Sequence, residues 1–234
     1  MLMGQNVRLR GLERPDLPAV VRWFADPEVR ARLARVELIS LAEEERWFDA
    51  LLRSTTEIVF AIEALDPAGD VAGEARFVGT CGLHRIDWRN RSAVLGIVIG
   101  DIDNRHRGTG TEAVRCLLRH AFDSLGLYRV ELEVLVDNVP AVGCYERLGF
   151  ITEGVRVGAR FQQGRFVDLR LMRLLVTEWH DSSSKPSSKP SSKPSSKASS
   201  KASSKASSKP SSKASSKASS SSSSKASSKR ARSP

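Results

Sequence analysis

One short stretch constrains the fold of this chain more than any other, the turn Asn104-Arg-His-Arg-Gly-Thr-Gly-Thr111. An apolar run rich in valine and isoleucine spans residues 93–100, just before the turn, and predicts a buried strand. After the turn, apolar residues recur at helical spacing from Ala113 to Leu125. The sequence therefore predicts a unit of strand, glycine-containing turn and helix.

The turn has two properties of an anion-binding site. Gly108 and Gly110 let backbone N–H groups converge on one point, and the first N–H groups of the following helix have no partner inside that helix. Arg105 and Arg107 place positive charge beside these groups. A phosphate or pyrophosphate fits such a turn. The turn is not a P-loop, because no Lys-Ser/Thr pair follows, and it lacks the third glycine of the dinucleotide-binding fingerprint.

The next segment predicts a second strand and a short helix. Residues 129–136 alternate between polar and apolar side chains, as a half-buried strand does. Asn138 and Pro140 then provide a helix N-cap and a first helical turn, and Gly149 provides a stop. The chain therefore repeats the order of strand and helix directly after the anion turn.

Three motifs occur here in an order that is known from one protein family. They are Arg105-x-x-Gly108-x-Gly110, the asparagine Asn138, and Tyr145-Glu-Arg-Leu-Gly-Phe150. In this order they resemble the GNAT superfamily of acyl-CoA-dependent N-acetyltransferases, over about residues 7–175. The resemblance is closest to the group that contains ribosomal-protein N-terminal alanine acetyltransferases and spermidine acetyltransferases. It implies an α/β (α+β) GNAT fold, with a mixed central sheet of about seven strands and about four helices.

The resemblance also implies roles for individual residues. Acetyl-CoA is the implied acetyl donor, and no metal is implied. The pyrophosphate of the coenzyme is expected at Arg105, His106, Arg107, Gly108, Thr109, Gly110 and Thr111. The backbone at Ile97, Val98 and Ile99 is expected to meet the pantetheine arm and the thioester. Asn138 matches the family asparagine near the pantetheine, and Tyr145 matches the tyrosine that acts as general acid toward the leaving thiolate.

The general base is less well defined than the general acid. Glu133 lies where the ribosomal-protein acetyltransferases carry a general-base glutamate within a Leu-Glu-Val motif. Glu131 is on the same face of the strand, since side chains alternate along a strand. The two carboxylates could repel each other, or either could form an ion pair with an arginine. A chain of water molecules could also take the place of a base.

Residues near the N-terminus predict part of an acceptor site. Residues 7–12 are expected to form an edge strand, residues 66–70 a turn, and Ser40-x-x-Glu43 a capping box that starts a helix. In the resembling family the first two helices cover the acceptor entrance. The acids Glu43, Glu44 and Glu45 are therefore candidates for contact with a cationic amine, although the helix dipole also explains acids in a first turn.

Charge is distributed unevenly along the chain. The formal net charge is +10, but residues 182–234 contain eleven lysines, two arginines and no acidic residue, whereas residues 1–181 contain 24 arginines, no lysine and 27 acidic residues. The tail repeats Ser-Ser-Lys-Pro or Ser-Ser-Lys-Ala, which predicts disorder. We therefore expect a GNAT domain over residues 1–181 and a disordered basic tail over residues 182–234. The tail is a candidate for binding RNA or DNA.

Cysteines, histidines and the N-terminus limit the compartment and the chemistry. Cys81, Cys116 and Cys144 are odd in number and widely spaced, which argues against a disulfide framework and favours a reducing compartment. No signal-peptide pattern or apolar run of membrane-spanning length occurs. The four histidines show no spacing typical of a metal site. These features predict a cytoplasmic protein, associated with ribosomes or the nucleoid if the tail binds nucleic acid.

Three functions remain open at this point. The first is an acetyl-CoA-dependent N-acetyltransferase that acts on a protein N-terminal amine, with the basic tail as a tether to nucleic acid. The second is an enzyme that acetylates a small cationic amine, such as a polyamine or an aminoglycoside. The third is a non-enzymatic protein that binds nucleic acid through its tail, and the intact motif residues argue against it. The oligomeric state and the acceptor are not defined by the sequence.

Overall fold

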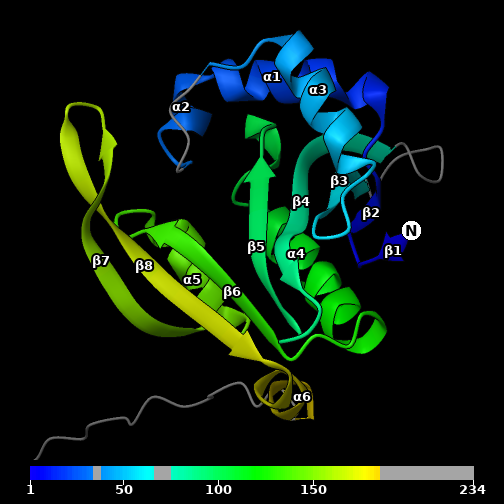
Figure 1. The fold of residues 1–234 in the computed structure, drawn as a ribbon, viewed down its shortest axis with the longest axis vertical. Helices are drawn as coiled ribbons and strands as arrows, with labels where there is room; N and C mark the ends of the chain where they lie inside the picture. Colours follow the sequence, from blue (N-terminus) through cyan, green and yellow to red (C-terminus); the bar gives the residue numbers. More distant parts are fainter. Residues whose placement is uncertain (34–37, 66–74, 185–234) are drawn as a thin grey trace, which may run out of the picture. The chain divides into compact units, whose positions relative to one another are not determined.

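The computed structural model describes residues 1–33, 38–65 and 75–184 (Figure 1). Its strands are β1 (Leu2–Met3), β2 (Val7–Gly11), β3 (Ile58–Leu65), β4 (Ala75–Asp87), β5 (Ser92–Ile99), β6 (Arg129–Leu135), β7 (Ile151–Gln162) and β8 (Arg165–Leu175). Its helices are α1 (Leu17–Ala25), α2 (Pro27–Arg30), α3 (Leu41–Leu51), α4 (Thr109–Arg119), α5 (Val139–Arg147) and α6 (Val176–Ser184). This order of elements confirms the predicted α+β architecture.

The strands form one sheet in the order β1-β2-β3-β4-β5-β6-β8-β7, so it has eight strands where the sequence predicted about seven. The additional strand is β1, in which Leu2 pairs with Leu9 and Met3 pairs with Arg8. The prediction that residues 7–12 form the edge strand is therefore wrong, because β1 covers the outer side of β2. A strand of two residues is too short to show a periodic pattern in the sequence.

The parallel pair in the middle of the sheet is short. Ser92 of β5 pairs with Arg129 of β6, and Val94 pairs with Glu131, but the ladder between the two strands ends there. The other neighbouring strands in the described sheet are antiparallel, which confirms the predicted mixed sheet. Beyond Val94, the backbone of β5 on the side of β6 therefore has no ladder partner.

Side chains that alternate along the strands pack in two layers. On one face, Leu83 and Leu95 pack in the same core as Leu117 of α4. On the other face, Leu17 of α1 and Phe48 of α3 enclose a smaller core over β3. Burying one such leucine or phenylalanine contributes about 2 kcal/mol relative to leaving it exposed. The burial of these apolar faces therefore fixes α1, α3 and α4 on the sheet.

Two helix starts follow the predicted capping chemistry. The Ser40 hydroxyl accepts from the Glu43 N–H at 3.2 Å, and the Glu43 carboxylate accepts from the Ser40 N–H at 2.8 Å, so the capping box of α3 is confirmed. The Asn138 side chain accepts from the Ala141 N–H at 3.4 Å and caps α5. Gly149, with a φ of +95°, ends the turn after α5.

Helix α1 meets the end of β5 at a single glycine. A Cβ atom at Gly100 would lie 1.9 Å from a ring carbon of Trp23, so the indole lies directly on the glycine backbone. The Trp23 ring also packs against Phe77, with 4.8 Å between the ring centroids. Any larger residue at position 100 would push α1 away from the strand end.

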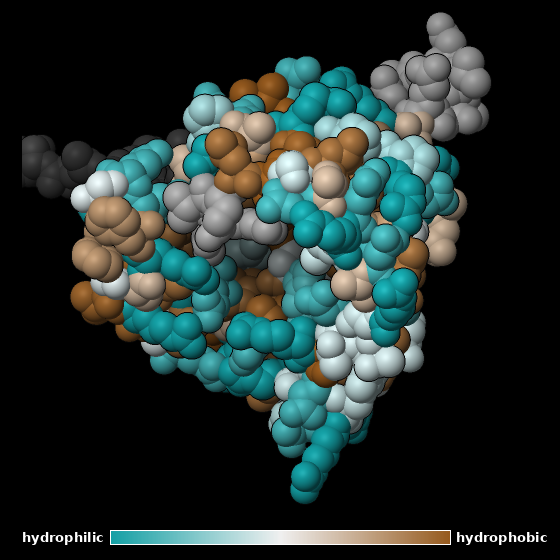
Figure 2. Space-filling model, turned by 45° about the horizontal axis from the view of Figure 1, so that its top comes forward, coloured by the Kyte–Doolittle hydropathy of each residue, from teal (hydrophilic) through white to brown (hydrophobic). Residues whose placement is uncertain are grey.

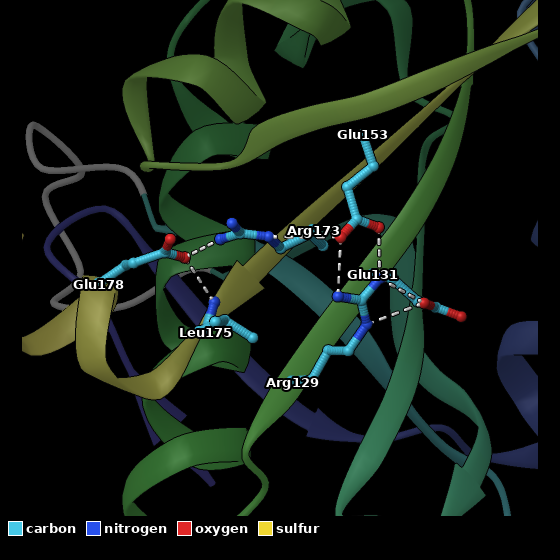
Figure 3. A network of polar contacts seen from close by, with 6 residues as sticks. All are labelled: Arg129, Glu131, Glu153, Arg173, Leu175 and Glu178. Carbon is cyan, nitrogen blue, oxygen red and sulfur yellow. Dashed lines mark hydrogen bonds and ion pairs between the residues drawn. The ribbon is translucent and has the colours of Figure 1, made fainter.

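Ion pairs connect the last two strands and the last helix to β6 (Figure 3). Arg129 of β6 contacts Glu131 on the same strand and Glu153 on β7. Arg173 of β8 contacts Glu153 and also Glu178 of α6. Hydrogen bonding to Arg129 holds the pKa of Glu153 below its usual range.

Some predictions concern residues that lie partly or wholly outside the described ranges. The predicted turn at residues 66–70 lies outside them, as does the tail from residue 185 onward. Helix α6 continues to Ser184, so it passes the predicted domain boundary by three residues. Within the described part of the chain, no helix is both long enough and apolar enough to cross a membrane.

Candidate active site

A cavity of about 840 Å³ lies where β5 and β6 have separated. Its walls come from β5, from the turn before α4, from α5 and from β6, and Arg32 and Leu33 close it beyond α2. Figure 2 shows a hollow with a hydrophobic floor and a largely hydrophilic rim on this side of the molecule. The cavity is large enough for a long ligand that enters between the two strands.

The predicted anion turn forms part of the cavity wall. Gly108 has a φ of +85°, in the left-handed region that favours glycine, and it is the N-cap of α4. The Glu112 N–H donates to the Gly108 carbonyl at 3.0 Å. The N–H groups of Thr109, Gly110 and Thr111 precede this bond in the chain, so they have no acceptor within the helix. They can bind an anion at the positive end of the α4 dipole.

The side chain of Arg105 contacts the backbone of the strand end. Its Nε donates to the Ile99 carbonyl at 3.2 Å, and a terminal nitrogen lies 3.5 Å from the Gly100 carbonyl. The guanidinium group also lies 3.5 Å from the Glu28 carboxylate, and only 9% of the side chain is exposed. Arg105 therefore ties the turn to both β5 and α2, and Glu28 offsets part of its charge.

Tyr145 lies on the buried side of α5 and lines the cavity. Its side chain is almost completely buried, and its ring packs edge-on against Phe150, with 5.7 Å between the centroids. Burial raises the pKa of Tyr145 above its ordinary value, and the neighbouring Cys144 adds to the effect. A phenol with a raised pKa keeps its proton at neutral pH, as a general acid must.

One contact caps α5 and another joins it to α4. Asn138 caps α5 and also lines the cavity, so it can serve both as a cap and as a ligand contact. The Cys144 sulfur lies 3.1 Å from the Thr111 hydroxyl, which joins the middle of α5 to the first turn of α4. Tyr145 follows Cys144 directly, so the second contact lies next to it in the chain.

Glu133 lines the cavity, but guanidinium groups already engage its oxygen atoms. Arg156 lies 2.8 Å from one oxygen, and Arg160 lies 3.9 Å from the other. Glu131 is paired with Arg129 at 3.1 Å. Both carboxylates are thus arranged as arginine ion pairs, which was one of the two alternatives for them.

The structure brings most of the predicted site residues to this one cavity. Its lining includes Ile97, Val98, Ile99, Arg105, His106, Gly108, Gly110, Thr111, Glu133, Asn138 and Tyr145. Two predicted residues are not part of the lining. Thr109 is buried at the start of α4, and Arg107 is exposed on the outer side of the turn.

Sequence reasoning missed two cationic residues of the cavity, Arg32 and Arg147. Arg147 lies one helical turn after Gly143, and its guanidinium lies 3.4 Å from where a Cβ of that glycine would be. Gly143 also lines the cavity, and the spacing of four residues places Arg147 beside it on one face of the helix. Arg32 follows α2 in a segment without any motif, so no comparable signal was present in the sequence.

A second cavity of about 300 Å³ adjoins the first and shares Arg32 and Asn138 with it. The turn between β7 and β8 forms its outer wall through Gln162, Gln163 and Arg165. The Gln162 side chain donates to the Arg30 carbonyl at 3.0 Å, so the hairpin reaches the end of α2. This cavity is a candidate for the acceptor side of the site.

The acids of α3 do not form the predicted contact with a cationic amine. Glu43 belongs to the capping box, and Glu44 is 3% exposed. The described residues that line the two cavities do not include Glu43, Glu44 or Glu45. The alternative explanation, acids that stabilise the first turn of a helix, therefore accounts for Glu43.

The cysteines are unpaired in the described part of the chain. Cys81, Cys116 and Cys144 are free thiols, and burial raises the pKa of Cys81. No group of three histidine, cysteine or acidic side chains that could hold a metal ion occurs within the described residues.

A ligand that fits these walls carries a diphosphate at one end and its reactive group far from it, along an unpaired strand edge. The class of protein that this arrangement defines is an acyl-CoA-dependent transferase. A family model described as the acetyltransferase (GNAT) domain matches residues 6–151, so the chain belongs to the GNAT acetyltransferase family. The protein is an N-acetyltransferase that depends on acetyl-CoA.

Individual relatives fall in the same family. Spermidine N(1)-acetyltransferase from Vibrio cholerae is 26% identical over 181 residues, which cover 77% of this chain and 99% of that protein. A crystal structure of spermidine N-acetyltransferase from Vibrio cholerae in complex with CoA and spermine gives a TM-score of 0.68 at 26% identity, and covers 75% of this chain and 98% of that one.

Two further relatives differ in the length that they match. The L-methionine sulfoximine/L-methionine sulfone acetyltransferase from Pseudomonas paraeruginosa is 29% identical over 179 residues, which cover 74% of this chain and 95% of that protein. The putative ribosomal N-acetyltransferase YdaF from Bacillus subtilis is 35% identical over 101 residues, which cover 43% of this chain and 55% of that protein.

Proposed function

We propose that this protein transfers the acetyl group of acetyl-CoA to the primary amine of a small molecule. The observation that carries the proposal is the cavity between β5 and β6, where the anion turn and Tyr145 face one space. Several relatives that match over nearly their whole length are named for small amines: spermidine, and methionine sulfoximine or sulfone. A small amine therefore replaces the protein N-terminal amine, the first prediction from sequence, as the leading acceptor.

The described residues supply most of what acetyl transfer needs. The N–H groups at the start of α4 bind the diphosphate, and the backbone of β5 beyond Val94 bonds to the pantetheine arm. The neutral amine attacks the thioester carbonyl, so that a carbon–nitrogen bond forms and the carbon–sulfur bond breaks. Tyr145 donates its proton to the departing thiolate. Arg147 adds positive charge that suits the phosphates of the coenzyme.

A panel of amines tests the acceptor class. Release of CoA thiol is measured with spermidine, with methionine sulfone and with peptides that begin with alanine. We expect turnover with at least one small amine, with kcat/KM at least about tenfold above that of the peptides. Turnover with the peptides alone would favour the first prediction from sequence, in which the acceptor is a protein N-terminal amine. Absence of both turnover and calorimetric heat with acetyl-CoA would contradict the whole proposal.

Nucleic-acid binding by the basic tail stays a prediction that rests on charge alone. The relatives lend it no support. Its test is a mobility shift with RNA or DNA, compared between the full chain and a chain that ends at Asp181. We expect the full chain to bind in a manner that weakens steeply with salt, and the truncated chain not to bind.

A further inference from the structure

Acetyl transfer needs a group that removes a proton from the amine, and Glu133 is engaged by two arginines. A histidine that is paired with a glutamate lies nearby in the sheet. The Nδ1 atom of His84, on β4, lies 3.3 Å from the Oε1 atom of Glu57, which immediately precedes β3. About one-third of each side chain is exposed, at 33% for His84 and 32% for Glu57, so the pair is open to solvent.

This contact selects one form of the imidazole ring. When Nδ1 carries a hydrogen and donates it to the Glu57 carboxylate, the neutral ring has its lone pair on Nε2. A hydrogen bond of this kind favours this tautomer and orients the ring. The same arrangement, a base oriented by a third group, is common to many catalytic sites.

The Nε2 atom of His84 lies over a glycine of β5. A Cβ atom at Gly96 would be 3.1 Å from Nε2 and 3.2 Å from the adjacent ring carbon. Gly96 is itself part of the cavity lining, and it comes two residues after Val94, where the ladder to β6 ends. Because glycine has no side chain, the lone pair on Nε2 is close to the cavity at the open edge of β5.

We propose that His84, oriented by Glu57, accepts the proton of the acceptor amine, across Gly96 and through one water molecule. This inference rests on the proposed acetyl transfer. The substrate ammonium loses one proton to Nε2, and the neutral nitrogen then attacks the thioester carbon. Tyr145 gives its proton to the thiolate. The nitrogen then loses a second proton, which restores the proton of Tyr145. His84 releases its proton to solvent, so that each turnover yields one amide, one CoA thiol and one proton.

The other charged groups near this part of the sheet pair with one another, including Arg173 with Glu153. Glu57 lies on the side of β3, while Glu131 and Glu133 lie on β6, where Arg129 and Arg156 pair with them. Among the described residues, Glu57 is the charged group within hydrogen-bond distance of the ring. A change in the pH profile after substitution of His84 therefore reports on this pair.

The experiment compares H84A, H84Q and E57Q with the wild type in thiol release, with spermidine and methionine sulfone as amines. We expect kcat of H84A and H84Q to fall about 100-fold or more, with the acid limb of the pH–rate profile lost. The coenzyme Kd should stay unchanged. E57Q should fall about tenfold, because the ring remains but its orientation is weakened. Added imidazole should restore part of the H84A rate, after correction for a blank without amine.

His180 on α6 provides a matched control, because it also lies beside a carboxylate, 3.9 Å from Asp123. Neither histidine lines a cavity itself, but His84 lies against Gly96, which does. H180Q should keep the wild-type rate. Wild-type kinetics in H84A would overturn the inference alone, and so would loss of coenzyme binding in both His84 variants, since that marks a structural role. A wild type that turns over neither amine would overturn the proposed function together with the inference.

Discussion

The two sides of the cavity are built differently, and the difference decides what each tolerates. We call residues 97–111 the coenzyme wall, because this continuous segment presents mainly backbone groups. We call Arg32, Glu133 and Gln162 the acceptor wall, because it consists of side chains from three distant segments. The coenzyme wall depends on the path of the chain, and therefore on glycine at positions 100 and 108. The acceptor wall depends on side-chain identity, so it can change its specificity without a change in fold.

The largest expected effect tests whether backbone conformation rules the coenzyme wall. In Gly108→Val, a β-branched residue must adopt a φ near +85°, which shifts the N–H groups at the start of α4. We expect the Kd for acetyl-CoA, measured by calorimetry, to rise about 100-fold. Gly164→Val is the control, because Gly164 has a φ of +77° in the β7–β8 turn. Equal losses of coenzyme affinity in both variants would mean that general backbone strain is responsible.

Tyr145 tests the chemistry between the two walls. Tyr145→Phe keeps the packing against Phe150 but removes the acidic proton, so kcat should fall about 100-fold while coenzyme Kd is unchanged. Because the pKa of Tyr145 is raised, the wild type should keep its activity up to pH 10, where an ordinary tyrosine is half ionised. Tyr128→Phe is the control at an exposed tyrosine. A decline that already begins near pH 8 would contradict the role of Tyr145.

Gln162 tests the acceptor wall. Gln162→Ala removes the hydrogen bond to the Arg30 carbonyl, which frees the hairpin turn from α2. The KM for the amine should rise about fivefold in steady-state kinetics, while the coenzyme Kd stays the same, because a single hydrogen bond contributes about 1 kcal/mol. Val157→Ala, at an exposed position of the same strand, should have no effect. A change in coenzyme affinity without a change in the KM for the amine would assign the hairpin to the coenzyme wall.

The smallest expected effect lies away from both walls. Glu153→Gln removes one partner of Arg129 and Arg173, and it should cost less than about 1 kcal/mol of unfolding free energy, since Glu153 is largely solvated. The pKa of Glu153 is lowered in the folded state, so its contribution is present above the unfolded pKa and is lost as the pH falls through the folded pKa. Urea unfolding at pH 7 and pH 3 should therefore differ less in the variant than in the wild type.

The coenzyme wall could be predicted because its determinants are local in the sequence. A β-branched run, two glycines and a helical period specify a strand, a turn and a helix without any distant contact. Asn138 and Tyr145 were found in the same way, since Asn138 lies at the start of a helix and Tyr145 lies two helical turns after it. For these residues the chemistry follows from sequence spacing.

The acceptor wall and the proposed base could not be predicted, because pairings between distant segments create them. His84 is opposite Val94 through the register of an antiparallel pair, and it contacts Glu57 through the next pair in the sheet. Arg156 reaches Glu133 across β8, which lies between their strands. A single sequence does not encode such registers in a visible pattern. The role of Glu133 was therefore underdetermined, and Arg32 was missed.

The close approach of Trp23 to Gly100 links two positions that are 77 residues apart. Because the indole fills the only space that a side chain at position 100 could occupy, the two positions can be exchanged only as a pair, with a smaller ring accompanying a larger strand residue. Homologous sequences should then show covariation at these two sites. The size of the aromatic group would act as a spacer that sets how far the helical cover stands from the diphosphate turn.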